Sequence, residues 1–236
     1  MVQPEAGFRF SLDALLLASF ARARAGQRLI DLGTGCGVAA FGFMLGRPLE
    51  IEAVGVDMDP AMIRAARENA DRLGLAERFQ AFEIPVDKVR ERFEPEGFDL
   101  AVCNPPYRAP GGGRVCAKEE RTQSRFETRG GLDDFLAAGF FLLKNQGLIN
   151  LIYPADRLAA LFNSLARARL EPKRMMMVHG RAREPARLVL VEARKNGRPE
   201  LRVEPPLFLH QGEGGQTRLT GRAVEFCPFL ACNPGN

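Results

Sequence analysis

The chain has 236 residues, of which 46% are hydrophobic and 26% are charged, and these proportions are ordinary for a soluble globular protein. Its net charge of +4 permits a polyanionic partner without requiring one. The apolar run over residues 12–20 contains Asp13 and is shorter than the roughly 20 residues that span a bilayer, and the five cysteines lack zinc-ligand spacing. We therefore expect a cytoplasmic protein with no membrane segment, no cleavable signal, no metal and no stable protein partner.

Short apolar runs alternate with helical patterns, which predicts an α/β fold with a Rossmann-like, mostly parallel sheet of seven strands and helices on both faces. We expect one domain over residues 1–205, followed by an irregular tail over 206–236 in which Gly and Pro are frequent. In chain order the predicted elements are a helix over 11–24, a strand over 28–32, a helix over 38–45, a strand over 51–56, a helix over 60–73, strands over 79–83 and 98–103, a helix over 132–143, a strand over 148–153, a helix over 155–168, and strands over 174–179 and 187–193.

An amide, two prolines and an aromatic ring follow the predicted strand over 98–103, in the order Asn104-Pro105-Pro106-Tyr107. Open α/β sheets bind ligands outside the carboxyl ends of their strands, which is where this motif falls. Proline lacks a backbone donor and restricts the residue before it, so we expect a rigid turn whose carbonyl groups point outward. The motif can hold a planar amino group through two acceptors and stack a ring on Tyr107, although by itself it also fits a simple tight turn.

A glycine-rich loop, Gly33-Thr34-Gly35-Cys36-Gly37, follows Asp31 at the first predicted strand-to-helix turn. Glycines there permit positive φ and the close approach of a ligand. A dinucleotide fingerprint needs a further glycine where Val38 stands, so the spacing suits S-adenosylmethionine better. Asp57, at the end of the next strand, can accept hydrogen bonds from both ribose hydroxyls. The simpler alternative is a structural turn with a surface carboxylate.

Positive charge is concentrated in the last third of the chain. Residues 156–203 hold twelve Lys and Arg against five acidic residues, a net charge of +7, which leaves −3 for the rest of the chain. A long predicted loop over 108–130 adds further basic residues, and loops of this length are usually functional or mobile. This distribution fits a surface that tracks RNA phosphates, although arginines on helix faces also serve solubility. The RNA-binding candidates are Arg108, Lys118, Arg121, Arg125, Lys173, Arg181 and Arg183.

Together these motifs resemble those of class I methyltransferases that use S-adenosylmethionine to methylate amino groups. More narrowly, the chain resembles the bacterial family that methylates N6 of the adenine beside the anticodon of a valine tRNA. This resemblance covers roughly residues 3–205 and implies S-adenosylmethionine as cosubstrate and tRNA as partner. It rests on the glycine loop, Gly55-Val56-Asp57, Asn104-Pro105-Pro106-Tyr107, the run from Gly7 to Leu17 and the run from Pro185 to Glu192.

The resemblance also implies a role for each matching residue. The Asn104 side-chain oxygen and the Pro105 carbonyl would accept the two N–H groups of adenine N6, and Pro106 and Tyr107 would complete the catalytic set. Residues 1–27 would cover the cofactor, although Phe10 could also merely pack against the sheet. The family usually has an Asp after the third strand that meets the cofactor's adenine; here Glu83 or Asp87 stands in that region, and we favour Glu83. The cofactor-binding candidates are Arg9, Phe10, Asp13, Asp31, Gly33, Thr34, Gly35, Cys36, Gly37, Asp57, Met58 and Glu83.

Other functions fit the same motifs. Enzymes that methylate a glutamine side chain of release factors use the same Asn-Pro-Pro-Tyr device, but they usually carry a helical domain before the sheet, and only about 27 residues precede the first strand here. A catalytically silent RNA-binding module that holds S-adenosylmethionine is a second alternative, against which the intact Asn104 argues. Methylation of a small molecule also stays open.

Overall fold

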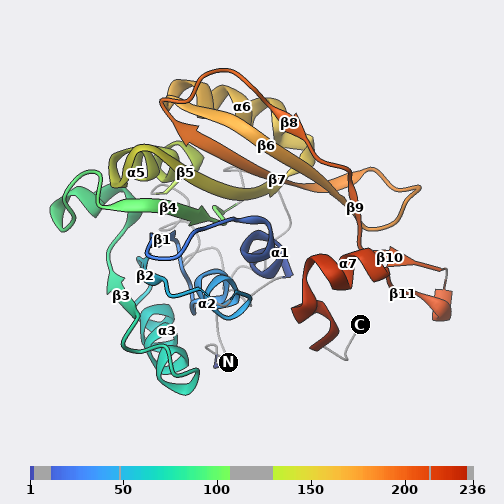
Figure 1. Cartoon of the computed structure of the whole chain (residues 1–236), viewed down its shortest axis with the longest axis horizontal. Coiled ribbons are helices and arrows are strands. Elements are labelled where there is room, and N and C mark those ends of the chain that lie inside the picture. Colours follow the sequence, from blue (N-terminus) through green and yellow to red (C-terminus); the bar gives the residue numbers. More distant parts are fainter. Residues whose placement is uncertain (3–11, 48, 107–129, 213, 233–236) are drawn as a thin grey trace, which may run out of the picture.

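A computed structural model describes residues 1–2, 12–47, 49–106, 130–212 and 214–232. Its strands are β1 (Arg28–Leu32), β2 (Glu52–Asp57), β3 (Phe79–Glu83), β4 (Phe98–Cys103), β5 (Leu143–Pro154), β6 (Leu170–His179), β7 (Ala186–Lys195), β8 (Arg202–Val203) and β9 (Leu207–Phe208). They form one sheet with the order β3-β2-β1-β4-β5-β7-β6-β8, and β9 pairs with β6 (Figure 1). From β3 to β5 all neighbours are parallel, whereas β7 is antiparallel to both β5 and β6, so β6 runs in the same direction as β5.

Helices cover both faces of this sheet, as Figure 1 shows. The helices are α1 (Leu12–Phe20), α2 (Val38–Leu45), α3 (Pro60–Arg72), α5 (Leu132–Leu142) and α6 (Leu158–Arg167), and a 3-10 helix, η1 (Val86–Glu91), follows β3. Side chains of α1, α2 and α3 join the core on one face, and those of η1, α5 and α6 join the core on the other. The start of α3 follows from its sequence, because Asp59 accepts a hydrogen bond from the Ala61 N–H and Pro60 fits the first helical position.

All seven predicted strands are present, because each is an apolar run that the helices bury. Strands β1, β3 and β4 have the predicted bounds, whereas β5, β6 and β7 are longer, since their pairing continues past the apolar residues. Helix α1 ends at Phe20 rather than at residue 24, because Arg24 and Gln27 already bond to each other in a turn. The predicted helix over 155–168 is divided into a 3-10 turn (Ala155–Arg157) and α6.

The segment after residue 205 differs from the expected irregular tail. After β9, a hairpin of β10 (His210–Gln211) and β11 (Arg218–Leu219) leads to α7 (Gly221–Phe226) and the 3-10 helix η4 (Pro228–Cys232), which both contact α1. The prediction was wrong for the described part of this segment, because its core residues are widely spaced and their partners lie far along the chain. Those core residues are Leu207, Ala223, Cys227 and Leu230.

The strand order reverses between β1 and β4. The chain runs outward from β1 to β2 and β3 and later returns to β4 on the other side of β1. Such a switch point opens a crevice at the carboxyl ends of the two strands, which is where open α/β sheets bind ligands. Among the described residues no helix is both long and apolar enough to cross a membrane.

Candidate active site

The register of the parallel strands brings several sequence candidates together at the carboxyl edge of the sheet. Leu32 pairs with Cys103, so the glycine loop after β1 lies beside Asn104 after β4. On the other side of β1, Asp57 at the end of β2 pairs with Glu83 at the end of β3. Candidates from four neighbouring strands therefore line the crevice of the switch point.

The glycine loop folds back onto the end of β2. The N–H groups of Gly33 and Thr34 both donate to the Val56 carbonyl, each at 2.9 Å. The φ angles of Gly33, Gly35 and Gly37 are +70°, +54° and +91°, values that residues with a Cβ rarely adopt. A Cβ built on Gly35 would meet no described atom within 4 Å. The loop backbone is therefore open at Gly35, where a ligand can approach it closely.

Asp31 is a buried carboxylate just before this loop, with only 2% of its surface exposed. Its Oδ2 accepts hydrogen bonds from Thr34 Oγ1 at 2.8 Å and from the Ala40 N–H at 3.2 Å. Burial raises the pKa of Asp31 to about 7 and the nearby charge of Asp57 adds to this shift, although both hydrogen bonds favour the ionised form. Asp31 therefore changes charge near neutral pH, and a cation beside the loop would favour its ionised form.

Asp57 braces the loop from the neighbouring strand. Its Oδ2 accepts from the Gly35 N–H at 2.8 Å, and its Oδ1 accepts from the Asp59 N–H at 2.9 Å. Burial raises the pKa of Asp57, while these backbone donors oppose the shift. A carboxylate has about four lone-pair positions, and the backbone N–H groups of Gly35, Asp59 and Met58 use part of them. Asp57 can thus support the loop and keep acceptor capacity for a ligand hydroxyl.

Asn69 is a part of this site that sequence reasoning missed. It lies on the buried face of α3 and is fully buried. Its Nδ2 donates to the Cys36 carbonyl of the glycine loop at 3.1 Å and to the Val2 carbonyl at 2.8 Å, and its Oδ1 accepts from the Val2 N–H at 2.5 Å. One amide thus joins the start of the chain to the loop. The sequence signal was slight, since Asn69 is a single polar residue at a core position of a helix.

The turn after β4 begins at the boundary between core and surface. Asn104 is half-buried, Pro105 is buried and Pro106 is exposed. Cys103, directly before them, is fully buried, and burial raises the pKa of its thiol well above the usual range. The thiol therefore stays neutral and serves as packing, which leaves Asn104 and the Pro105 carbonyl as the polar groups of this strand end.

The remaining cofactor candidates lie around the same edge. Met58 is half-buried and directly follows Asp57, and Cys36 is buried within the loop. Both acids considered for the cofactor's adenine are exposed, Glu83 at the end of β3 and Asp87 in η1. Only Glu83 is a register neighbour of Asp57, so its position agrees with our preference for it. Asp13 lies in the first turn of α1.

Some of the sequence candidates fall outside the described residues, and their roles stay predictions. Two of them are cofactor candidates in the N-terminal segment. The others belong to the catalytic motif or to the loop that follows it. They are Arg9, Phe10, Tyr107, Arg108, Lys118, Arg121 and Arg125.

The described RNA-binding candidates do not lie together. Arg181 and Arg183 belong to the turn after β6, and β6 runs in the same direction as β4, so this turn lies at the carboxyl edge. Lys173 lies near the start of β6, at the opposite edge. Its Nζ donates to the Arg198 carbonyl at 2.8 Å and lies 3.7 Å from Glu200, so it is already bound within the protein. The position of Lys173 argues against a shared surface with Arg181.

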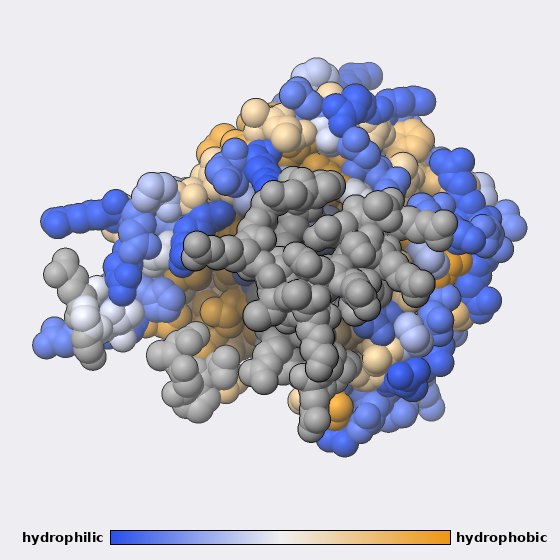
Figure 2. Space-filling model, turned by 180° about the vertical axis from the view of Figure 1, so that it is seen from behind, coloured by the Kyte–Doolittle hydropathy of each residue, from blue (hydrophilic) through white to orange (hydrophobic). Residues whose placement is uncertain are grey.

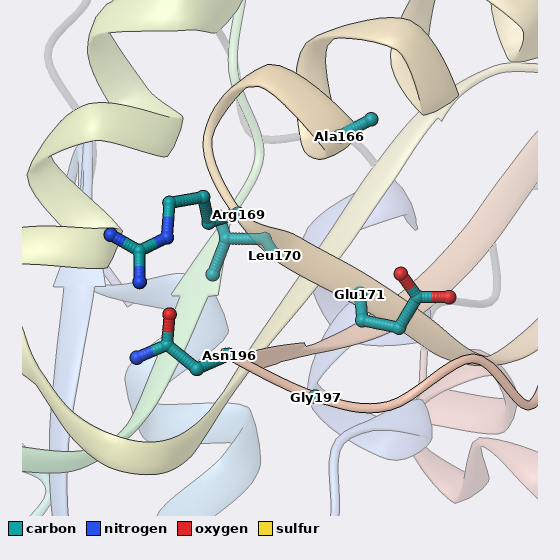
Figure 3. A pocket seen from close by; sticks show the side chains of 6 residues that line it. All are labelled: Ala166, Arg169, Leu170, Glu171, Asn196 and Gly197. Carbon is teal, nitrogen blue, oxygen red and sulfur yellow. The ribbon is translucent and has the colours of Figure 1, made fainter.

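A polar cavity of about 230 Å³ lies at the same opposite edge of the sheet (Figure 3). It is bounded by the turn before β6 and the turn after β7, and Arg169 and Asn196 in these turns have φ of +58° and +52°. The Asn196 N–H donates to the Arg169 carbonyl at 3.0 Å, so the two turns are bonded to each other. The cavity is therefore a gap between structural turns, removed from the crevice of the switch point. Its lining residues are Ala166, Arg169, Leu170, Glu171, Asn196 and Gly197.

Comparison with known proteins agrees with this geometry. Residues 23–176 match the family model described as a methyltransferase domain. A tRNA1(Val) (adenine(37)-N6)-methyltransferase of Haemophilus influenzae (strain PittEE) is 25% identical over 217 residues, which cover 91% of this chain and 89% of that protein. The protein of the same name from Yersinia enterocolitica is 27% identical over 226 residues, or 93% and 83% of the two chains. Among solved structures, a predicted O-methyltransferase from Agrobacterium tumefaciens has a TM-score of 0.73 at 23% identity and covers 92% of this chain and 95% of that one.

Proposed function

This chain belongs to the methyltransferase domain family, and we propose from that premise that it transfers a methyl group from S-adenosylmethionine to N6 of an adenine in tRNA, beside the anticodon. The observation that carries the proposal is the position of Asn104 and Pro105 at the end of β4, next to the glycine loop across the switch point. The names of the two relatives support adenine N6 of tRNA as the acceptor.

The acceptor nitrogen determines what the site must do. The amino group of adenine is a poor nucleophile, because its lone pair is delocalised into the ring. The Asn104 side-chain oxygen and the Pro105 carbonyl would accept its two N–H bonds, draw the nitrogen toward tetrahedral geometry and make the lone pair available. The contribution of these residues is therefore orientation and electrostatics. Tyr107 would stack on the base.

The described residues fit S-adenosylmethionine as cosubstrate. The open backbone at Gly35 admits a ligand, and Asp57 keeps acceptor capacity for the ribose hydroxyls. When bound, S-adenosylmethionine supplies an activated methyl group on a positively charged sulfur. Asp31 is a buried acid beside the loop, and in its ionised form it favours a cationic ligand there. Glu83 would meet the adenine of the cosubstrate, and its pairing with Asp57 at the strand ends supports this role.

A direct assay tests the proposal. The purified chain is incubated with radiolabelled S-adenosylmethionine and unmodified tRNA, and the product RNA is digested to nucleosides. We expect the label in N6-methyladenosine. Label in a release-factor protein would favour the glutamine methyltransferase instead, and binding of both ligands without transfer would favour a silent RNA-binding module.

A further inference from the structure

We propose that the described residues of the segments 180–187 and 207–220 form one basic arm that binds the phosphate backbone of the substrate RNA beside the loop that carries the target base. The first segment contains the turn between β6 and β7, and the second contains β9, β10 and β11. This inference rests on the proposed function. It adds the surface on which the stem of the RNA lies, and it assigns a role to a C-terminal segment that the sequence left without one.

The arm lies at the edge of the sheet where the reaction takes place. Strand β6 runs in the same direction as β4, so the turn that follows His179 projects from the same edge as Asn104. Strands β5 and β7 separate β4 from β6. Three steps of about 4.8 Å separate the two strands across the sheet, and β6 continues four residues of about 3.3 Å each beyond Met175, which is level with Cys103, so the turn lies roughly 20 Å from the crevice. A stem attached to a base in the crevice can bridge this separation.

The two parts of the arm are bonded to each other. The Leu209 N–H donates to the His179 carbonyl at 3.0 Å, and the His210 N–H donates to the Gly180 carbonyl at 2.9 Å. The Arg181 guanidinium bridges them as well, since it donates to Glu184 Oε1 and to Thr217 Oγ1, each at 3.0 Å. The arm is therefore a single preformed surface.

The arm is also anchored to the body of the protein. Leu207 at its start is fully buried, and Thr220 at its end caps α7 by accepting the Ala223 N–H at 3.0 Å. Cys227 and Leu230, which follow α7, are buried against the core beneath α1. These contacts hold the arm in a defined place relative to the crevice.

The charge of the arm suits a polyanion. Its sequence holds four arginines against two acids, Glu184 and Glu213, and Arg181 neutralises Glu184. Arg183, Arg187 and Arg218 are exposed, and none of them forms an ion pair with another described residue. Hydrophilic residues predominate on this projection, which lies on the left of Figure 2.

The chemistry of the hairpin fits a phosphate group in particular. A hollow of about 550 Å³ opens there, and the described residues that line it are uncharged except for Arg218; they are Gln211, Gly212, Gln216, Thr217 and Arg218. Guanidinium groups pair with phosphate oxygens through two parallel hydrogen bonds. The Thr217 hydroxyl already donates to the Gly214 carbonyl at 2.9 Å, so the glutamine amides and Arg218 are the side-chain donors of this hollow. Amide donors beside an arginine are typical of contacts to a nucleic-acid backbone, which position the RNA without reading its sequence.

A salt series on matched variants tests the arm. The probes are a synthetic RNA stem-loop with an adenine in its loop and a single strand of the loop sequence alone. The triple variant Arg183→Gln, Arg187→Gln, Arg218→Gln should bind the stem-loop about tenfold more weakly at low salt. The magnitude of the slope of log K against log salt should fall by about 2.1–2.7, since each of three lost phosphate contacts removes about 0.7–0.9. Arg198→Gln, an exposed arginine at the opposite edge, is the control and should change neither value.

The loop-only strand separates the arm from the crevice. Its affinity should be almost the same for the wild type and the triple variant, because it lacks the stem that the arm binds. Unchanged affinity for S-adenosylmethionine and an unchanged Tm confirm that the variant is folded. A stem-loop slope equal to that of Arg198→Gln, or an equal loss for both RNAs, would overturn the arm. Absence of methyl transfer by the wild type would instead overturn the proposed function.

Discussion

Asp31 and the pair of Arg174 with Glu192 are buried ionisable side chains in one row on the same face of the sheet. They differ in how close they lie to the carboxyl end of their strands. Register pairing connects Asp31 to Val102, Asn150, Glu192 and Arg174 in turn. Asp31 is one residue from the end of β1, whereas β5 continues four residues beyond Asn150. Only one end of the row therefore reaches the crevice.

At the interior end of the row the charged side chains are paired with each other. Arg174 donates to Glu192 Oε2 at 3.0 Å and to the Phe20 carbonyl at 2.8 Å, and its guanidinium stacks on the Phe20 ring at 3.8 Å from the centroid. Both charged side chains are buried. This ion pair links the end of α1 to β6 and β7, and the partners named above all belong to the protein itself.

The crevice end of the row is electrostatically incomplete. Asp31 is buried beside a second carboxylate, Asp57, and its hydrogen bonds come from neutral donors. Its pKa near 7 expresses the cost of a charge that no cation among the described residues offsets. The comparison shows that buried ionisable groups in one layer can have opposite purposes: a matched pair stabilises the fold, whereas an unmatched acid at a switch point suits a charged ligand.

The largest expected effect comes from breaking the matched pair. Arg174→Met leaves Glu192 as a buried charge without its partner and should lower the free energy of unfolding by about 3–5 kcal/mol. For a chain of this size that corresponds to a fall in Tm of roughly 10 °C. The double variant Arg174→Met, Glu192→Leu should recover most of the loss. Thermal unfolding measures all three proteins, and a single variant as stable as the wild type would contradict the structural role.

The next effect concerns catalysis at the carboxyl edge. Asn104→Ala removes one of the two acceptors for the amino group and should lower kcat at least about a hundredfold, the range seen when one preorganised electrostatic partner is removed. Affinity for S-adenosylmethionine and thermal stability should stay close to wild type, because Asn104 belongs to the acceptor side of the crevice. Single-turnover methyl transfer measures the rate. An active Asn104→Ala enzyme would contradict the assigned role.

The two ends of the row also differ in how far the sequence reveals them. The glycine loop, Asp57 and Asn104 were each predicted at the carboxyl end of a strand, and the carboxyl ends of parallel strands meet at one edge of the sheet. The pairing of Arg174 with Glu192 could not be predicted, since it depends on the register of two strands joined by a turn. Asn69 and the C-terminal segment were missed for another reason, because the residues that they contact in the loop and in β6 are distant in the chain.

A smaller effect distinguishes Asp31 from the matched pair through its pH dependence. Burial raises its pKa in the folded protein to about 7 from 3.8, so its ionisation costs stability as pH rises from about 4 to 7. Asp31→Asn can keep both hydrogen bonds on its one oxygen and removes this cost. Denaturant unfolding should therefore show the variant gaining stability relative to the wild type across that window. A pH-independent difference would contradict an ionisable Asp31.

The same substitution should change ligand binding. Below pH 7 the wild type must ionise Asp31 to favour a cationic ligand, so its affinity for S-adenosylmethionine should fall by up to about tenfold per pH unit and level off above pH 7. Asp31→Asn should bind more weakly at pH 8 and lose this pH dependence. Calorimetric titration with S-adenosylmethionine from about pH 5.5 to about pH 8.5 measures the affinity of both proteins and its pH dependence.

The smallest effect tests the hydrogen bond that tunes Asp31. Thr34 Oγ1 donates to the carboxylate and favours its ionised form, so Thr34→Val should raise the pKa of Asp31 further. A lost hydrogen bond of about 0.5–1.5 kcal/mol corresponds to a several-fold weaker affinity for S-adenosylmethionine at pH 7, with recovery at higher pH. Thr34→Ser keeps the hydroxyl and should retain the wild-type pH profile. If Thr34→Val lost affinity equally at every pH, Thr34 would act through packing of the loop. That result would contradict an effect of its hydroxyl on the charge of Asp31.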